Sequence, residues 1–190
     1  MLANRNTQIP LILYANHSSW WDGLTAFQIS HKCRLDSYIM MEEKNLKKTI
    51  LFTRLGAFSV VRENPKQAMQ SVNYAAELLQ NNRNRVLWIF PQGEILPNDV
   101  RPLKFFNGLS RIIKKIGSCE TTAVAMRYEF RGKFKPEVFV KIARLEFRDD
   151  HTVENHKLLT ESLSANLTAA LNELKSDVIN SETDNYLNII

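Results

Sequence analysis

Short runs of apolar residues alternate along the chain with longer segments in which apolar residues recur every three or four positions. The short runs have the length of strands, and the longer segments have the periodicity of helices. The predicted strands are 9–15, 37–41, 57–61, 86–90, 121–130 and 138–147, the last alternating like a half-exposed edge strand. One helix is predicted to begin near residue 19 or 20. Further helices are predicted over 46–55, 65–79, 109–116 and 153–179, and the last range holds one helix or two. This alternation predicts an α/β domain with a largely buried sheet.

Proline and glycine positions sharpen several of these boundaries. Pro65 suits the first turn of a helix, and Gly56 suits the residue that follows a helix end. Two prolines and the pair Asn98-Asp99 mark 94–102 as a loop. With 190 residues, the chain has the length of one domain, which we place at 1–180, with 181–190 as a flexible tail.

Unusual polar residues follow three of the predicted strands. Asn16-His17 comes directly after the first strand, Arg62 after the third, and Pro91-Gln92-Gly93 after the strand that ends near Phe90. Ligand sites of open α/β sheets form at the carboxyl ends of strands. We therefore expect these three clusters to share one cleft.

His17 and Asp22 are spaced to work as a pair. The imidazole can take a proton from a substrate hydroxyl, while the carboxylate fixes the tautomer and stabilises the imidazolium that forms. Such a pair is the base and orienting acid of a catalytic triad, with the substrate hydroxyl as nucleophile. The same residues also fit a capping box, in which Ser19 caps a helix and Asp22 is only its third residue.

Two further clusters suit anion binding. Backbone N–H groups of the turn at Phe90-Pro91-Gln92-Gly93-Glu94 can bind a phosphate or an oxyanion. Arg62, at the end of a predicted strand, can bind phosphate with two hydrogen bonds. An ordinary turn and a solvated surface arginine are the alternatives.

Composition narrows the function classes. The net charge of +5 favours an anionic partner, but no nucleic-acid-binding module is recognisable. No Gly-x-Ser-x-Gly elbow of a serine hydrolase occurs, and His17, Asp22 and His31 do not have a convincing metal-ligand spacing, so we expect no metal site. Cys33 and Cys119 are expected to be reduced core thiols. No apolar stretch approaches the ~20 residues that span a bilayer.

The clusters together resemble the glycerolipid acyltransferase family, whose best-known members are the 1-acylglycerol-3-phosphate acyltransferases. That family has four motifs, of which the first is a histidine, four residues and an aspartate. Here the matching segments occur in the same order, at 16–22, 56–62, 90–93 and 121–126, and the resemblance covers about 9–128.

The resemblance implies a mixed, mostly parallel sheet flanked by helices and transfer of a fatty acyl group from acyl-CoA or acyl-carrier protein to a lipid hydroxyl. It implies no cofactor beyond this co-substrate. His17 would be the general base and Asp22 its partner, Arg62 would contact an acceptor phosphate, and Gly93 would shape the turn of the third motif. Lysophospholipid, glycerol-phosphate-type and glycosylated lipid acceptors all remain open.

The third motif departs from the family pattern, which is usually Phe-Pro-Glu-Gly-Thr followed by Arg-Ser. Gln92 replaces the glutamate, Glu94 replaces the threonine, and the positive charge is absent. Arg101 and Lys104 are candidates to compensate for that lost charge. In the fourth motif Ala123 stands where proline is usual. A lipid-binding homologue without turnover is the alternative that these departures suggest.

A membrane surface is the expected location. The segments 46–55 and 105–116 mix apolar and basic residues as amphipathic helices on an anionic leaflet do, although packing on the sheet would give the same pattern. Trp20 and Trp21 either line an acyl groove or belong to the core. We expect a cytoplasmic protein on the inner face of a membrane, with surface patches or a preceding segment as its anchor.

Overall fold

The computed structural model describes residues 2, 5–43, 46, 51–54, 56–61, 64–132, 134–149 and 155–188. Seven strands form one sheet, in the order β3-β2-β4-β1-β5-β6 with β7 also beside β5. The strands are β1 (Leu11–Ala15), β2 (Asp36–Glu42), β3 (Ala57–Val60), β4 (Arg85–Ile89), β5 (Cys119–Glu129), β6 (Glu137–Ile142) and β7 (Glu146–Arg148). The pairs among β1 to β5 are parallel, whereas β6 and β7 run antiparallel to β5. The predicted mixed, mostly parallel sheet is confirmed.

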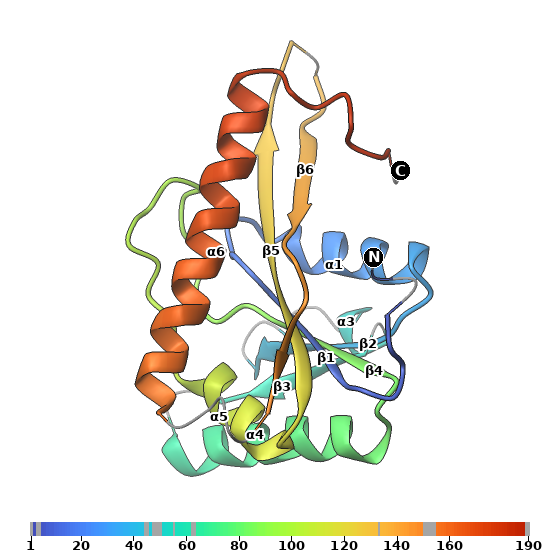
Figure 1. Cartoon of the computed structure of the whole chain (residues 1–190), viewed down its shortest axis with the longest axis vertical. Helices are drawn as coiled ribbons and strands as arrows, with labels where there is room; N and C mark the ends of the chain where they lie inside the picture. The colour runs from blue at the N-terminus through green and yellow to red at the C-terminus, as the bar shows by residue number, and fades with distance from the viewer. Residues whose placement is uncertain are drawn as a thin grey trace.

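Helices cover both faces of this sheet, as Figure 1 shows. They are α1 (Asp22–Lys32), α3 (Leu51–Arg54), α4 (Pro65–Asn81), α5 (Gly108–Ile116) and α6 (His156–Ile179). Ile12 and Tyr14 of β1 belong to the core cluster that contains the buried residues of α4, α5 and α6. The alternate β1 residues belong to a second cluster, with residues of α1. The strand is buried on both faces, which is why its sequence is an uninterrupted apolar run.

Helix signals in the sequence agree with the structure. Pro65 is the first residue of α4, and the Asn64 side chain caps the helix by accepting the N–H groups of Lys66 and Gln67 at 3.0 and 3.2 Å. α5 buries its apolar side in the core and exposes Arg111 and its other basic residues. Its amphipathic pattern therefore reflects packing within the domain, which was the alternative to a membrane-surface helix. α6 is one continuous helix along β5 and β6 (Figure 1).

The prediction of a single edge strand over 138–147 is wrong. β6 and β7 are separate because two residues of β5, 122–123, face three residues of the returning chain, 143–145. The extra residue is a β-bulge, and Ala143 remains fixed there by the Thr122 hydroxyl, which donates to its carbonyl at 2.7 Å. Alternating polarity does not reveal such an insertion.

Three predicted segments are only partly described, because 153–154 of the last predicted helix and 189–190 of the tail lie outside the described residues, as does part of the helix predicted over 46–55. Of the helix predicted over 46–55, the residues 51–54 are helical as α3, while 47–50 and 55 lie outside the described residues. In the predicted tail, Tyr186 packs edge-on against Phe139 and donates to Asp177 at 2.8 Å. None of the helices in the described residues combines the length and apolar character needed to span a membrane.

Candidate active site

The end of β1 is held against β5 by one side chain. Asn16 is buried, and its amide donates to the Met126 carbonyl at 2.9 Å while its oxygen accepts the Met126 N–H at 2.8 Å. An asparagine can satisfy both backbone groups at once because it carries a donor and an acceptor. It thereby fixes where the chain leaves the sheet and so where His17 begins.

His17 and Asp22 form a hydrogen-bonded pair. Nδ1 of His17 lies 2.7 Å from Oδ2 of Asp22, whose side chain is fully buried, while the His17 side chain is 21% exposed. An ionised carboxylate can only accept, so Nδ1 carries the hydrogen in this pair and Nε2 is left to accept a proton. The Phe90 ring packs on the imidazole with centroids 4.9 Å apart. The pair therefore has the tautomer and orientation that a general base requires.

The carboxylate of Asp22 also organises the turn before α1. Its Oδ2 accepts the N–H groups of Ser18 and Ser19 at 2.7 and 2.9 Å, and its Oδ1 accepts the hydroxyl of Tyr128 at 2.6 Å. Trp21 is the N-cap and Asp22 the first helical residue, so the predicted Ser19 cap with Asp22 in third position is wrong. Asp22 does bind the Ser19 N–H, as in a capping box, but it binds His17 as well.

Residues that follow β4, including Gln92 of the third motif, form hydrogen bonds with the backbone of His17. Gln92 is buried, and its Oε1 accepts the His17 N–H at 2.9 Å, while the Leu96 N–H donates to the His17 carbonyl at 2.9 Å. Gly93 has a φ of 71°, which favours glycine, and its N–H closes a tight turn onto the Phe90 carbonyl at 3.0 Å. Gln92 thus touches the backbone of His17 and is not among the residues that line the adjoining cavity.

Other charged candidates lie apart from His17. Arg101 donates to the carbonyls of Asn98 and Val100 at 3.1 and 2.8 Å and to Asn172 of α6 at 3.4 Å. Glu94 and Lys104 are exposed, and none of these three residues lines the cavity. Arg62 lies outside the described residues.

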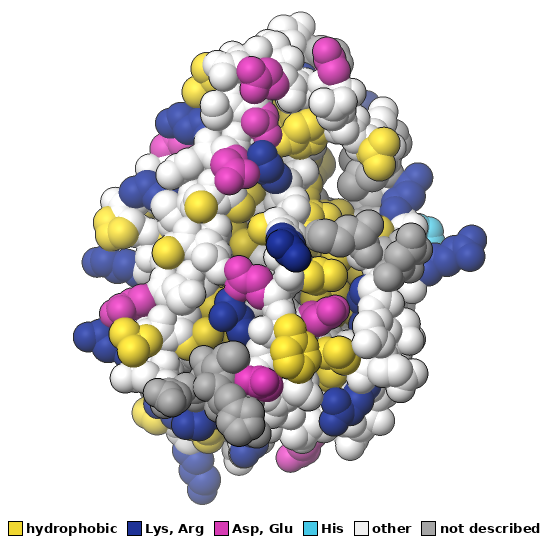
Figure 2. Space-filling view, in the orientation of Figure 1, with side chains coloured by type: hydrophobic (Ala, Val, Ile, Leu, Met, Phe, Trp, Pro, Cys, Tyr) yellow, Lys and Arg dark blue, Asp and Glu magenta, His cyan; other side chains and the backbone are white. Residues whose placement is uncertain are grey.

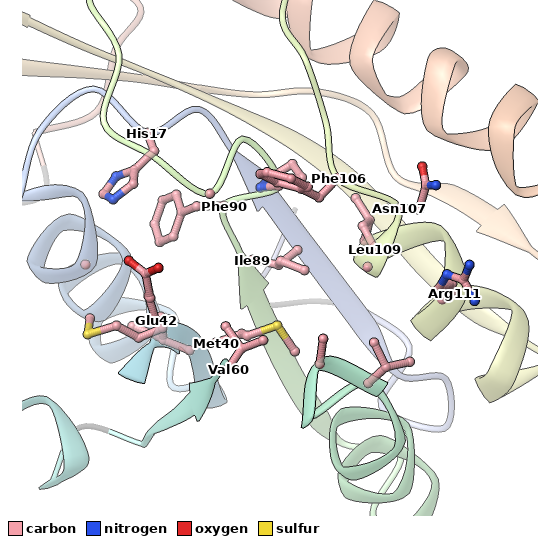
Figure 3. Close-up of a pocket in the computed structure, with 18 of the residues that line it drawn as sticks. His17, Met40, Glu42, Val60, Ile89, Phe90, Phe106, Asn107, Leu109 and Arg111 are labelled. Atoms are coloured by element: carbon pink, nitrogen blue, oxygen red, sulfur yellow. The ribbon is translucent and has the colours of Figure 1, made fainter. Parts of the chain in front are cut away.

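A cavity of about 550 Å³ opens beside His17 (Figure 3). Its wall is mostly apolar and is built by β2, β4, α4 and α5, with Met40, Ile89, Val72 and Leu109 as examples. Four large apolar side chains that line it are also well exposed to solvent: Trp20, Met69, Ile95 and Phe106. Trp20 therefore belongs to this rim and not to the core. No sequence motif marks the residues of this wall, because they share only their apolar character.

The remaining candidates offer no second centre. His31 stacks on Phe27 in α1, and the described residues contain no group of three or more His, Cys, Asp or Glu side chains that could hold a metal. Cys33 and Cys119 are free, and burial raises the pKa of the Cys119 thiol to about 12, which keeps it protonated.

Residues 2–128, about two thirds of the chain, match the acyltransferase family model. The matched part contains His17, Asp22, Gln92 and the segment of the fourth motif at 121–126, which lies within β5. The chain therefore belongs to the acyltransferase family. No curated protein matches it.

Proposed function

We propose that this protein is an O-acyltransferase that moves a fatty acyl group from acyl-CoA or acyl-carrier protein to a hydroxyl of a lipid acceptor. The observation that carries the proposal is the His17–Asp22 pair at the mouth of an apolar cavity. The acceptor classes are a lysophospholipid, a glycerol-phosphate-type lipid and a glycosylated lipid. Family membership supports acyl transfer, and the site supports this chemistry.

In the proposed reaction, Nε2 of His17 takes the proton of the acceptor hydroxyl as its oxygen attacks the thioester carbonyl. Asp22 stabilises the resulting imidazolium across the 2.7 Å contact. The tetrahedral intermediate then collapses to the ester, the C–S bond breaks, and the leaving thiolate takes the proton back from His17. Atoms and charge balance without a nucleophile from the protein.

The cavity suits the acyl chain. Its volume of about 550 Å³ lies in the usual range for small-molecule sites, and its mostly apolar wall gives each buried methylene about 0.8 kcal/mol relative to water. Figure 3 shows His17 and Phe90 at one side of the space, with Met40 and Val60 across from them. A chain bound there would have its thioester near the imidazole.

For the headgroup, Gly93 lines the cavity, whereas Gln92, Glu94, Arg101 and Lys104, the other predicted contacts that the structure describes, do not. We propose that Arg62 contacts an acceptor phosphate, on the strength of the family resemblance. Arg111 and Asn107 also line the cavity, and they are further polar groups that a substrate can meet.

We further propose that the cavity mouth rests on an anionic membrane surface at the inner face of a membrane. Trp20, Ile95 and Phe106 are each more than half exposed at the rim, where a bilayer would cover them. On the face in Figure 2, Lys and Arg side chains are scattered among Asp and Glu side chains. Co-sedimentation with anionic vesicles should fall several-fold in Trp20→Ser, whereas Phe134→Ser, at an even more exposed aromatic residue outside the rim, serves as control.

The decisive experiment measures thiol release from palmitoyl-CoA with a panel of acceptors that do or do not carry phosphate. His17→Ala should lower turnover by about a thousandfold or more while the protein stays folded. His31→Ala is the matched control, because this histidine stacks on Phe27 and does not line the cavity. Turnover retained by His17→Ala would disprove the mechanism.

A binding homologue without turnover is the second candidate, favoured by Gln92 and Glu94 at positions where the family usually has other residues. It predicts lipid binding without thiol release from any acyl-CoA or acyl-carrier protein. The intact His17–Asp22 pair favours the enzyme, since a binding protein needs no base held in one tautomer.

A further inference from the structure

Tyr128 contacts the His17–Asp22 pair from the part of β5 that extends beyond the end of β1. β1 ends at Ala15 opposite Val124, but β5 continues past this point, paired only with β6, where Tyr128 lies opposite Val138. This extension carries the Tyr128 hydroxyl to the first turn of α1. There it donates to Oδ1 of Asp22 at 2.6 Å.

The two oxygens of Asp22 have different partners. Oδ2 accepts from His17 and from two backbone N–H groups, whereas Oδ1 accepts the hydroxyl of Tyr128. Thr25 lies 3.2 Å from the Tyr128 oxygen, and because the phenol proton goes to the carboxylate, Thr25 is the donor in that contact. The result is a chain of hydrogen bonds from Thr25 through Tyr128 and Asp22 to His17.

The phenol remains a donor over the working pH range. Burial raises the pKa of Tyr128, and the charge and hydrogen bond of Asp22 raise it further. A protonated phenol on Oδ1 draws negative charge away from Oδ2, where the imidazole binds. It also holds the carboxylate plane, since a single pivot at Oδ2 would leave the group free to rotate.

We propose that Tyr128 is a positioning residue that tunes the strength of His17 as a base through the far oxygen of Asp22. Its catalytic consequence rests on the proposed acyl transfer. Without the phenol, Asp22 would stabilise imidazolium more strongly and hold the ring less firmly. The base would then be neutral only at higher pH, and turnover would be slower.

Other charged groups near His17 also affect how strongly it binds a proton. Among the described residues, the ionisable side chains that line the cavity with His17 are Glu42 of β2 and Arg111 of α5. Both keep their surroundings in a variant that removes only the Tyr128 hydroxyl, and Gln92 on the backbone side of His17 is uncharged. A change in pH dependence in that variant is therefore attributable to the chain through Asp22.

The test compares Tyr128→Phe and Thr25→Val with the wild type over about pH 5 to 9, using thiol release from palmitoyl-CoA with an accepted lipid. Tyr128→Phe should lower kcat about tenfold with KM within about twofold, and shift the acid limb of the kcat profile upward by about half a pH unit or more. Thr25→Val should change both in the same direction by less, because it weakens the Tyr128 donor indirectly. The control is Tyr14→Phe, which removes the hydroxyl of a buried tyrosine in β1 and should change neither kcat nor the pH profile.

An NMR titration of the His17 ring signals, assigned with His17→Ala, gives a readout that needs no turnover. Its midpoint should move to higher pH in Tyr128→Phe. An unchanged or lower midpoint in folded Tyr128→Phe would overturn the role of Tyr128, even with an active wild type. A wild type without turnover on any donor would overturn the proposed function instead, and the titration would still decide on Tyr128. If Tyr128→Phe does not fold, Thr25→Val decides by the same midpoint.

Discussion

The two halves of the site are built in opposite ways. At the His17–Asp22 pair, groups from three segments of the chain, 17–22, Gln92 and Tyr128, form hydrogen bonds of 2.6 to 2.9 Å. The cavity beside it has a mostly apolar wall, in which side chains of β2, β4, α4 and α5 meet without directional bonds. The first half depends on single atoms and the second on volume. Substitutions should therefore affect rate in the one and chain selectivity in the other.

The largest effect that separates the two halves is expected from Asp22→Asn. The amide keeps the size, and its oxygen can take the place of Oδ2, where the N–H groups of Ser18 and Ser19 require an acceptor, but it has no negative charge to stabilise the imidazolium. Turnover should fall about a thousandfold for long and short acyl chains alike. Steady-state kinetics with palmitoyl-CoA and octanoyl-CoA measures this, and a loss of less than about tenfold would contradict the role of Asp22.

Gln92→Leu should have the next largest effect. It leaves the His17 N–H without its 2.9 Å acceptor in a buried place, which should lower the free energy of unfolding by about 1–3 kcal/mol and turnover by about tenfold. Gln80→Leu is the matched control, since its amide donates to Lys115 on the exposed surface and should cost less than about 0.5 kcal/mol. Urea unfolding and thiol release measure the two quantities. Equal stability of both variants would show that the hydrogen bond from the His17 N–H to Gln92 does not stabilise the fold.

Filling the cavity should leave the chemistry intact. Met40→Trp places a larger side chain across the cavity from His17 (Figure 3), so turnover with palmitoyl-CoA should fall about tenfold relative to octanoyl-CoA. Met40→Leu, which nearly conserves volume, should keep the wild-type ratio. A uniform loss for both chain lengths would show that this wall is not where the acyl chain lies.

The smallest effect should come from the docked tail. Burial and Asp177 raise the pKa of Tyr186 to about 12, so this group stabilises the fold below its unfolded value of about 10 and loses that contribution as the pH rises through about 12. The raised pKa of Lys141, caused mainly by its hydrogen bond to Asp177, acts in the same direction. The thermal midpoint of the wild type should fall about a degree more than that of Tyr186→Phe between about pH 9 and pH 11.5. Identical falls would exclude a contribution from Tyr186.

Local patterns in the sequence predicted most of the fold. Buried strands such as β1 are continuous apolar runs, and the Pro65 start of α4 has a local cause in proline geometry. The bulge between β6 and β7 was missed because it depends on the register against β5 and not on the polarity of 143–145.

The candidate site was predictable where neighbours in sequence are also neighbours in space, as in His17 and Asp22. Tyr128 was missed because it meets Asp22 across 106 positions and has no motif of its own. Gln92 was expected to contact substrate, whereas it binds the His17 backbone, and Arg101 is held by its own loop and α6. Strand-end position indicates that a residue is near the site, but the direction of its side chain depends on tertiary packing.

The long sequence separation between the His17–Asp22 pair and the residues that hold it has a consequence for how the proposed activity would be acquired during folding. β1 pairs with β4 and β5, and His17 and Asp22 are fixed by residues 75 and 106 positions away. Contacts this distant close large loops and form late and slowly in folding. In a partly folded chain, His17 and Asp22 can therefore both be present without being held as a pair. Enzymatic activity should return only with the slowest step of refolding, after helix formation is complete.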